Sequence, residues 1–370
     1  MELTNSLFLF AGIQGCILGL ILYFSKRHNR LANKFLATFI LLFSLNIIRN
    51  LYTDTDLHPV LHYLYIITWS ITIFLGPVFY LYVRSLTGNA HIRFNTSFKH
   101  FIVPLSYLIF LSYGFFNGIV TNEAVQKHKT ILVLYTFFQL FIIVQLLTYL
   151  VLSLRIIWRY HKKLKDQYAD IDKLKLNWLF QLTTAILIQY LFWVLFFDGD
   201  LLLLKKNVPS IIIFIFRALA AVFVYWIGYY SLLKPEIFIE FNQQQSSSKK
   251  TIVAPQEIEK YKKKLLKLLT EDKIYLDASL TIHQLAKKLK TNSKIASQVI
   301  NTGFNKSFYD VINAYRIEEV KQNLLDPKYK NYTIEAIAFS SGFKSSTTFN
   351  RLFKRHTTLT PNQFKNNHLK

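Results

Sequence analysis

Residues 334–343, Ile334-Glu335-Ala336-Ile337-Ala338-Phe339-Ser340-Ser341-Gly342-Phe343, decide the fold of the last part of this 370-residue chain. Apolar side chains recur there at helical spacing, Thr333 is a suitable N-cap, and Gly342 supplies a turn. A second helix is predicted over 346–356 with Ser345 as its cap, and Thr360-Pro361 begins a closing helix. Two short helices joined by a glycine turn form a helix-turn-helix unit.

A more degenerate unit of the same kind precedes it. Thr281 is expected to cap a helix over 282–289, and Ser293 is expected to open the next helix over 294–300. An amphipathic helix comes before this unit, with its apolar stripe at Ile258, Tyr261, Leu265, Leu268 and Leu269. A longer helix, Phe308 to Leu325, ends before Pro327 and joins the two units. The sequence therefore predicts a tandem helix-turn-helix domain over residues 255–370.

Charge is concentrated in this C-terminal part. Residues 249–370 hold 23 Lys and Arg against 10 Asp and Glu, a net charge of +13, whereas the whole chain carries +23. A strongly basic small domain is typical of nucleic-acid binding. The plainer alternatives are a lysine-rich solubilising tail or a helical protein-interaction module.

The first 234 residues are predominantly apolar rather than basic. Hydrophobic residues make up 52% of the whole chain, and most of its long apolar runs lie in this part. Seven runs approach the ~20 residues that cross a bilayer. They lie near Leu7 to Phe24, Phe35 to Tyr52, Val60 to Val83, Phe101 to Val120, Ile131 to Leu154, Trp178 to Phe197 and Ile211 to Leu233. The predicted fold is all-α: a seven-transmembrane bundle over 1–234, an interfacial foot and flexible linker over 235–254, and the tandem domain.

Basic residues in the short loops predict the orientation of the spans. The loops after the first, third and fifth runs hold fourteen Lys and Arg, including the series from Arg155 to Lys175. The opposite loops hold Lys127, Lys129, Lys205 and Lys206, besides Arg49 near a span end. The positive-inside rule then places the N-terminus outside and the C-terminus in the cytoplasm.

Arg217 is the strongest candidate for a ligand contact within the spans, since a charge at membrane depth is costly and usually functional. It could bind an anionic ligand, pair with Asp198 or Asp200, or extend to the interface. Gln139, Gln145, Gln181 and Gln189 are interpreted as interhelical hydrogen-bond partners. The segment Asp54 to His62 contains two histidines and two carboxylates, but Pro59 explains it as a loop, so neither a metal nor a cofactor is predicted.

Residues 255 to 368 resemble the AraC/XylS family of bacterial transcription regulators, most specifically in the second unit. The resemblance implies that one recognition helix enters each of two successive major grooves. Carried over by position, it implies DNA contacts from Lys294, Ser297, Gln298, Ser346, Thr347, Thr348, Arg351 and Lys354. Arg351 suits guanine or phosphate, Gln298 suits adenine, and Thr348 suits a thymine methyl group, whereas the serines and Thr347 discriminate weakly. Lys354 suits phosphate.

Some positions depart from the family pattern. Asn305 and Thr358 stand where a glycine usually follows each recognition helix. Asn tolerates the left-handed backbone and Thr tolerates it poorly, so the last turn is expected to differ in shape. Ile295-Ala296 also replaces a more usual aromatic-leucine pair.

The membrane half is similar to the seven-helix sensor region of some membrane-tethered AraC-type regulators. The similarity rests on residues 75–86, Leu75-Gly76-Pro77-Val78-Phe79-Tyr80-Leu81-Tyr82-Val83-Arg84-Ser85-Leu86, followed by Lys99-His100-Phe101-Ile102-Val103-Pro104. It implies a one-component regulator in the membrane, with promoter DNA, the lipid bilayer, a second copy of the chain, RNA polymerase and an unidentified ligand as partners. No catalytic motif is present, so an enzyme is not predicted. Alternatives are a transporter or membrane enzyme with a DNA-binding tail, and a passive anchor controlled by a partner protein.

Overall fold

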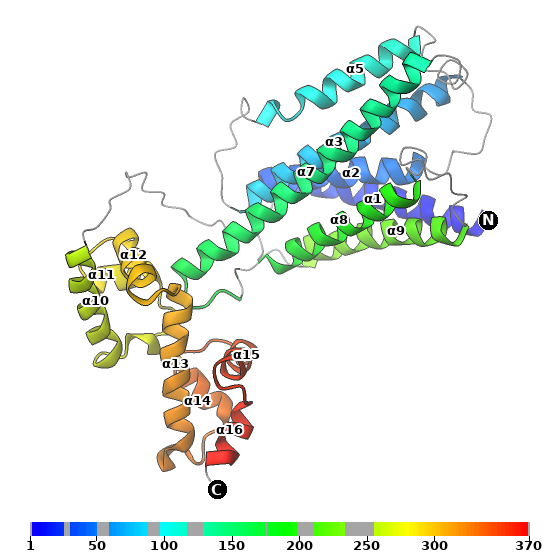
Figure 1. The fold of residues 1–370 in the computed structure, drawn as a ribbon. Coiled ribbons are helices and arrows are strands. Elements are labelled where there is room, and N and C mark those ends of the chain that lie inside the picture. Colours follow the sequence, from blue (N-terminus) through cyan, green and yellow to red (C-terminus); the bar gives the residue numbers. More distant parts are fainter. Residues whose placement is uncertain are drawn as a thin grey trace. The chain divides into compact units, whose positions relative to one another are not determined.

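The structure of the protein is a computed structural model and is helical throughout the part that it describes (Figure 1). It describes residues 2–25, 30–49, 59–87, 97–116, 129–172, 174, 176–197, 210–233 and 255–368. Within these ranges no β-strand occurs, and one isolated antiparallel bridge joins Tyr168 to Thr281. The chain forms two compact units, residues 1–158 with 176–244 and residues 159–175 with 245–370.

The described part of every apolar run predicted in the first unit lies almost entirely on a helix. The helices are α1 (Glu2–Phe24), α2 (Arg30–Arg49), α3 (Pro59–Leu86), α5 (Ile102–Phe116), α7 (Lys129–Gln167), α8 (Asn177–Phe197) and α9 (Ser210–Leu233). Among the described residues, three segments are long and apolar enough to cross a bilayer, namely Leu31–Ile48, Leu140–Gln167 and Asn177–Leu195. The apolar parts of α1, α3, α5 and α9 are shorter. Length and composition therefore support three spans rather than the seven predicted.

Small residues bring α1 and α2 close together. Gly12, Gly15 and Gly19 recur on one face of α1, and a Cβ atom added at Gly19 would lie 2.6 Å from Cγ of Leu41. Glycine lets two helix backbones approach at distances that a side chain would forbid, as in many membrane helix pairs. Helix α9 also contacts α1 and α2, and the buried side chains of Phe8, Ile47 and Val224 form a core between them.

Helix α7 is longer than its predicted span. It continues as one 39-residue helix to Gln167, thirteen residues beyond the predicted end at Leu154. The residues Arg155, Arg159, Lys162, Lys163 and Lys165, predicted to lie in a loop, are therefore on a helix. Charged residues ended the apolar run, but Lys and Arg are good helix formers and do not end a helix.

The second unit contains the tandem domain. Its elements are α10 (Pro255–Thr270), η2 (Ile274–Leu276), α11 (Ile282–Lys288), α12 (Ser293–Phe304), α13 (Phe308–Leu325), η3 (Pro327–Tyr329), α14 (Ile334–Ser340), α15 (Ser346–Thr357) and α16 (Pro361–His368). Figure 1 shows α13 joining the group α10–α12 to the group α14–α16. The bounds of α13 and the caps Thr281, Thr333 and Ser345 confirm the predictions. Helix α12 begins at Ser293, as predicted, but the residue that caps it is Asn292, whose side chain accepts the hydrogen bond from the Ile295 amide.

Arg316 on α13 ties the two groups together. Its side chain is 1% exposed, and it donates hydrogen bonds of 2.7 Å to the carbonyl oxygen of Tyr275 and 2.8 Å to that of Asp277. The guanidinium also lies 6.0 Å from the ring centre of Phe343, which belongs to the turn between α14 and α15. Burial lowers the pKa of Arg316 to about 10, which still leaves it charged at neutral pH. Buried charge satisfied by backbone carbonyls fixes this geometry.

Gly342 permits the turn between α14 and α15. Its φ is 92°, a conformation that favours glycine. A Cβ atom there would also lie 2.6 Å from the carbonyl oxygen of Tyr275 and 2.9 Å from Nε of Arg316. The predicted role of Gly342 is thus confirmed. Its close approach to Arg316 and to the backbone that Arg316 binds is a second reason for a glycine at this position.

Three predictions fall outside the described residues. The foot and linker over 235–254 belong to this group, as do positions 54–58 of the loop with two histidines. Arg217 lies on α9, but its side chain is not among those that the structure describes.

Candidate DNA interface

Helix α15 presents one buried face and one polar face. Phe349, Leu352 and Phe353 are buried, and the ring of Phe353 lies 5.5 Å from that of Phe364 on α16. The side chain of Ser345 caps the helix by accepting from the amide of Thr348 at 3.3 Å. The opposite face carries Thr347, Asn350, Arg351 and Lys354, all exposed. A helix held at its N-terminus by a cap and by an apolar face can enter a groove as a rigid rod.

The residues predicted to contact DNA do not all lie on that exposed face. Arg351 and Lys354 are exposed, with 49% of the Arg351 side chain accessible. Ser346 is partly buried beside Asn350, whose Nδ2 lies 3.5 Å from its hydroxyl. Thr348 is only 4% exposed, contrary to the accessibility that a base contact requires. The cause is a segment from elsewhere in the chain.

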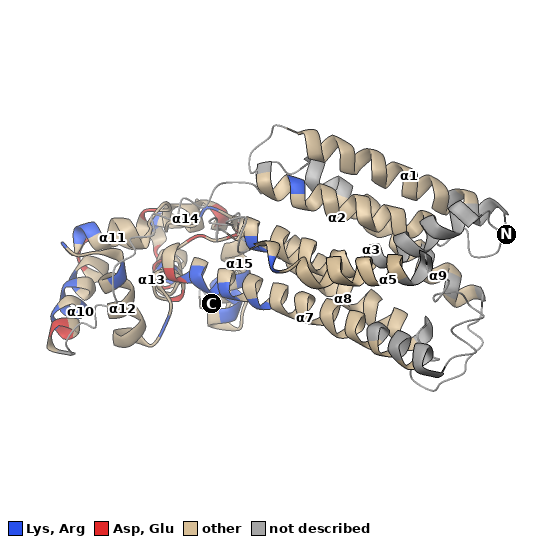
Figure 2. Ribbon diagram, turned by 90° about the horizontal axis from the view of Figure 1, so that it is seen from above, with Lys and Arg blue, Asp and Glu red and all other residues tan. Residues whose placement is uncertain are grey.

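Helix α12 is the corresponding helix of the first pair. Ala296, Val299 and Ile300 face the core and are buried, and Ile295, the other member of the Ile295-Ala296 pair, packs against the same core. Lys294 is exposed on the first turn, and Ser297 and Gln298 are partly exposed. Several basic residues lie on each of α10, α11 and α15, whereas α12 carries Lys294 alone. Figure 2 shows the Lys and Arg of α10 and α11 in blue. These helices can therefore attract a phosphate backbone.

The segment over residues 166–172, at the end of α7 and in the following loop, packs on the tandem domain. The amide of Ala169 donates to the carbonyl oxygen of Leu280 at 3.4 Å, and Tyr168 bridges to Thr281. Ala169 is 1% exposed within the core that contains Leu280, Ile282 and Ile312. Asn313 on α13 donates to the carbonyl oxygen of Ala169 at 3.0 Å.

Asp172, at the end of this segment, lies against α15. Its carboxylate accepts a hydrogen bond from the hydroxyl of Thr348 and lies 3.3 Å from Nη2 of Arg351. Tyr309 on α13 accepts from the same Arg351 nitrogen at 3.4 Å. Burial raises the pKa of Tyr309, so its hydroxyl stays protonated at neutral pH. Sequence reasoning missed this contact, because no periodicity connects two residues 176 positions apart.

Comparison with known proteins agrees with this geometry. Residues 285–367 match the model of an AraC-type helix-turn-helix domain family. The match covers α12 and α15 and supports a DNA-binding regulator of that type. No curated protein and no solved structure matches the chain.

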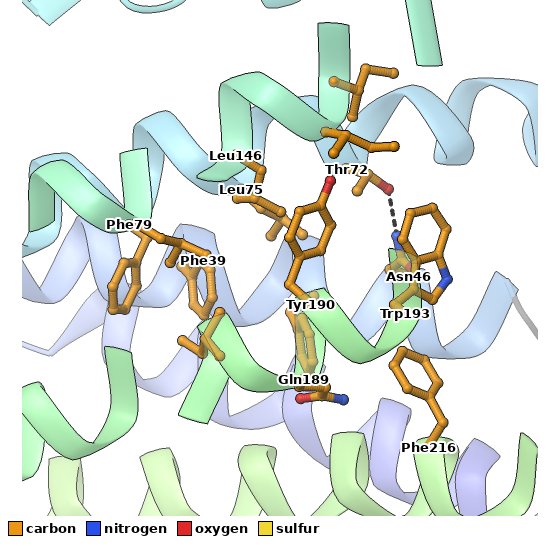
Figure 3. Close-up of a pocket in the computed structure, with 15 residues that line it drawn as sticks. Phe39, Asn46, Thr72, Leu75, Phe79, Leu146, Gln189, Tyr190, Trp193 and Phe216 are labelled. Atoms are coloured by element: carbon orange, nitrogen blue, oxygen red, sulfur yellow. Dashed lines mark hydrogen bonds between the residues drawn. The ribbon is translucent and has the colours of Figure 1, made fainter. Parts of the chain in front are cut away.

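The first unit contains a mainly apolar cavity of about 130 Å³ (Figure 3). Its walls come from α2, α3, α7, α8 and α9, and they include the rings of Phe39, Phe79, Tyr190, Trp193 and Phe216. Polar groups are few. Nδ2 of Asn46 donates to the hydroxyl of Thr72 at 2.7 Å, and Gln189, predicted to be an interhelical partner, also lines the cavity. Such a lining suits an uncharged apolar ligand with one or two hydrogen-bonding groups.

Proposed function

We propose that the protein is a one-component transcription regulator embedded in the bacterial inner membrane. Its N-terminal helices anchor it and receive a signal, and its C-terminal AraC-type domain binds promoter DNA in the cytoplasm. Promoter DNA, the bilayer, a second copy of the chain and RNA polymerase are its partners under this proposal. AraC-type domains bind two successive major grooves of DNA. The output of the proposed regulator is therefore binding at a promoter rather than a chemical reaction.

The observation that supports the membrane assignment is the direction of the apolar side chains. Phe10 is 62% exposed and Phe24 75% exposed on α1, Ile109 is 69% exposed on α5, and Ile188 is 63% exposed on α8. Figure 2 shows these helices nearly without charged residues in their described parts. Large apolar patches are costly in water, whereas lipid tails solvate them.

Lys294, Ser297 and Gln298 on α12 and Ser346, Thr347, Thr348, Arg351 and Lys354 on α15 are the proposed DNA contacts. Arg351 has the strongest chemistry among them, because a guanidinium can bond O6 and N7 of one guanine simultaneously. Lys354, one turn further along the same helix, is proposed to bind phosphate without reading sequence.

The cavity of the first unit is the proposed signal site, and Arg217 on α9 remains a proposed second ligand contact. A cavity lined by six aromatic side chains favours an apolar molecule over an ion. If Arg217 binds an anionic group of the signal, Arg217→Leu should change signalling but not membrane insertion, because the apolar side chain inserts more easily.

The decisive experiment measures DNA binding by the full chain in lipid nanodiscs. Binding of a fluorescein-labelled duplex of mixed sequence should weaken steeply as salt rises, with a log-log slope of about −5 if roughly six phosphates are neutralised. Nanodiscs without protein provide the baseline. A slope near zero would exclude DNA binding as the function.

A further inference from the structure

We infer that residues 166–172 are an internal competitor of DNA. In the docked state that the structure describes, Asp172 of this segment bonds Thr348 and Arg351 of α15, and tight DNA binding requires the release of these two side chains. The inference rests on the proposed function, because it assigns α15 to DNA. It identifies the occupant of the α15 face as a segment of the same chain and gives that occupant a regulatory role.

The segment is anchored to the domain by specific contacts rather than by charge alone. Ala169 inserts its methyl group into the core and pairs with Leu280 through its amide. Its carbonyl oxygen accepts from Asn313, a side chain that is 1% exposed. Ile171 is also 1% exposed. These contacts fix the position of the chain three residues before Asp172.

Asp172 then takes the bonds that DNA would need. A base acceptor reached by Thr348 has to approach the hydroxyl that is now bonded to the Asp172 carboxylate. A guanine or phosphate has to reach the guanidinium of Arg351 that is now 3.3 Å from the same carboxylate. A carboxylate and a phosphate offer the same anionic oxygen acceptors, so both cannot occupy these donors at once.

The composition of the segment supports the same role. Asp166, Asp170 and Asp172 place three carboxylates within seven residues, although the surrounding stretch from Arg155 to Lys175 is otherwise basic. Both Asp170 and Asp172 interact electrostatically with basic residues of the domain. Asp172 contacts Arg351, and Asp170 acts electrostatically on Arg316. The acidic segment thus complements the basic domain that is expected to bind a polyanion.

The docking is of a kind that a signal can reverse. Arg351 is 49% and Asp172 30% exposed, so solvent and salt screen their attraction. The segment is also continuous with α7, whose apolar part lines the cavity through Ile142, Ile143 and Leu146. A ligand that shifts α7 would therefore act on the segment through one unbroken helix.

The first test replaces Asp172 in the full chain in nanodiscs. Asp172→Ala should bind the mixed-sequence duplex about fivefold more tightly than the native protein, in the range that a half-exposed charge pair supports. Its salt slope should steepen by about 0.9, because Arg351 becomes available to one more phosphate. Asp272→Ala, which removes one exposed carboxylate on the loop before η2, is the control for net charge. Equal effects of the two variants would overturn the inference.

The second test locks the segment in place. Tyr168 and Thr281 face each other across an antiparallel bridge, where Cα atoms lie close enough for a disulfide. In a Cys16→Ala background, Tyr168→Cys with Thr281→Cys should bind the duplex weakly when oxidised and about fivefold more tightly after reduction. Thr281→Cys alone controls for the lost helix cap and should not respond to reductant.

The outcomes separate the two proposals. Equal affinity of the oxidised and reduced double variant, with normal salt-dependent binding by the native chain, would overturn the internal competitor and leave the proposed function standing. Absence of salt-dependent binding in the native chain and in every variant would overturn both.

Discussion

Asn305 and Thr358 occupy left-handed backbone positions at the ends of α12 and α15. Their φ angles are 50° and 63°. The sequence predicts a tolerated turn at Asn305, which is confirmed, and poor tolerance of this conformation by Thr358, which adopts it nevertheless. The amide of Thr358 donates to the carbonyl oxygen of Lys354 at 2.9 Å, as expected after a left-handed cap. Packing of Phe364 on Phe353 requires that reversal of direction and overrides the preference of threonine.

A glycine at position 358 should therefore stabilise the domain. Thr358→Gly removes the strain of a β-branched residue at positive φ, and after the entropy cost of glycine we expect a gain of about 0.5 to 1 kcal/mol. Asn305→Gly is the matched control and should change stability by less, because Asn tolerates this conformation. Amide hydrogen exchange of α15 and α16 in the full chain would measure the difference. Faster exchange in Thr358→Gly would contradict the strain.

Arg351 and Lys354 lie one turn apart on α15 and should differ in what they recognise. Once a specific operator is selected from a random DNA pool, Arg351→Ala should weaken binding to it by about 1 to 3 kcal/mol, and binding to mixed DNA by less. Lys354→Ala should weaken binding to both DNAs alike. Titrations with the two duplexes at one salt concentration provide the comparison. A uniform loss in both variants would reduce Arg351 to a phosphate contact.

At the scale of elements, local patterns predicted what depends on neighbours in sequence. The stripe at Ile258 to Leu269, the caps Thr281 and Thr333, and the full length of α13 are confirmed because each arises from helical spacing and capping chemistry. The extension of α7 was not predicted, since charge ended the apolar run but not the helix. The docking of Ala169 and the clamp of Arg316 depend on contacts distant in sequence, which periodicity cannot reveal.

Helix α7 offers neighbouring positions that test the cavity. Ile143 lines it, whereas Val144 is 59% exposed on the outside of the helix. Ile143→Phe should fill part of the cavity and abolish the effect of apolar ligands on duplex affinity. The measurement compares duplex affinity of the protein in nanodiscs with and without each ligand of a panel. Val144→Phe should retain the response, because it adds the same ring on the surface that we assign to lipid. Loss of response in both variants, or in neither, would contradict a ligand site there.

At the scale of the whole molecule, the chain passes between its two units at 158–159, 175–176 and 244–245. The sequence alone directs attention to the last of these passages. Its thirteen residues from Asn242 to Ala254 would span roughly 20 Å as a flexible coil, too loose to transmit a rotation. A flexible linker favours a mechanism in which the signal changes the pairing of two membrane bundles. Paired bundles would tether two DNA-binding domains together and raise their effective concentration. The first passage differs, because α7 crosses it as one helix.

The two routes predict opposite results when each connection is altered. Insertion of about ten Gly and Ser residues after Ser248 lengthens only the coil, so duplex affinity in nanodiscs should stay near that of the native chain. Lys162→Pro should break α7 four residues before the segment 166–172, at a cost of about 3 kcal/mol to the helix. Duplex affinity should then rise toward that of Asp172→Ala, because the segment loses its support. Lys162→Ala controls for the lost charge and keeps the helix. If the insertion raised affinity and the proline did not, the linker rather than α7 would connect the membrane to the DNA-binding domain.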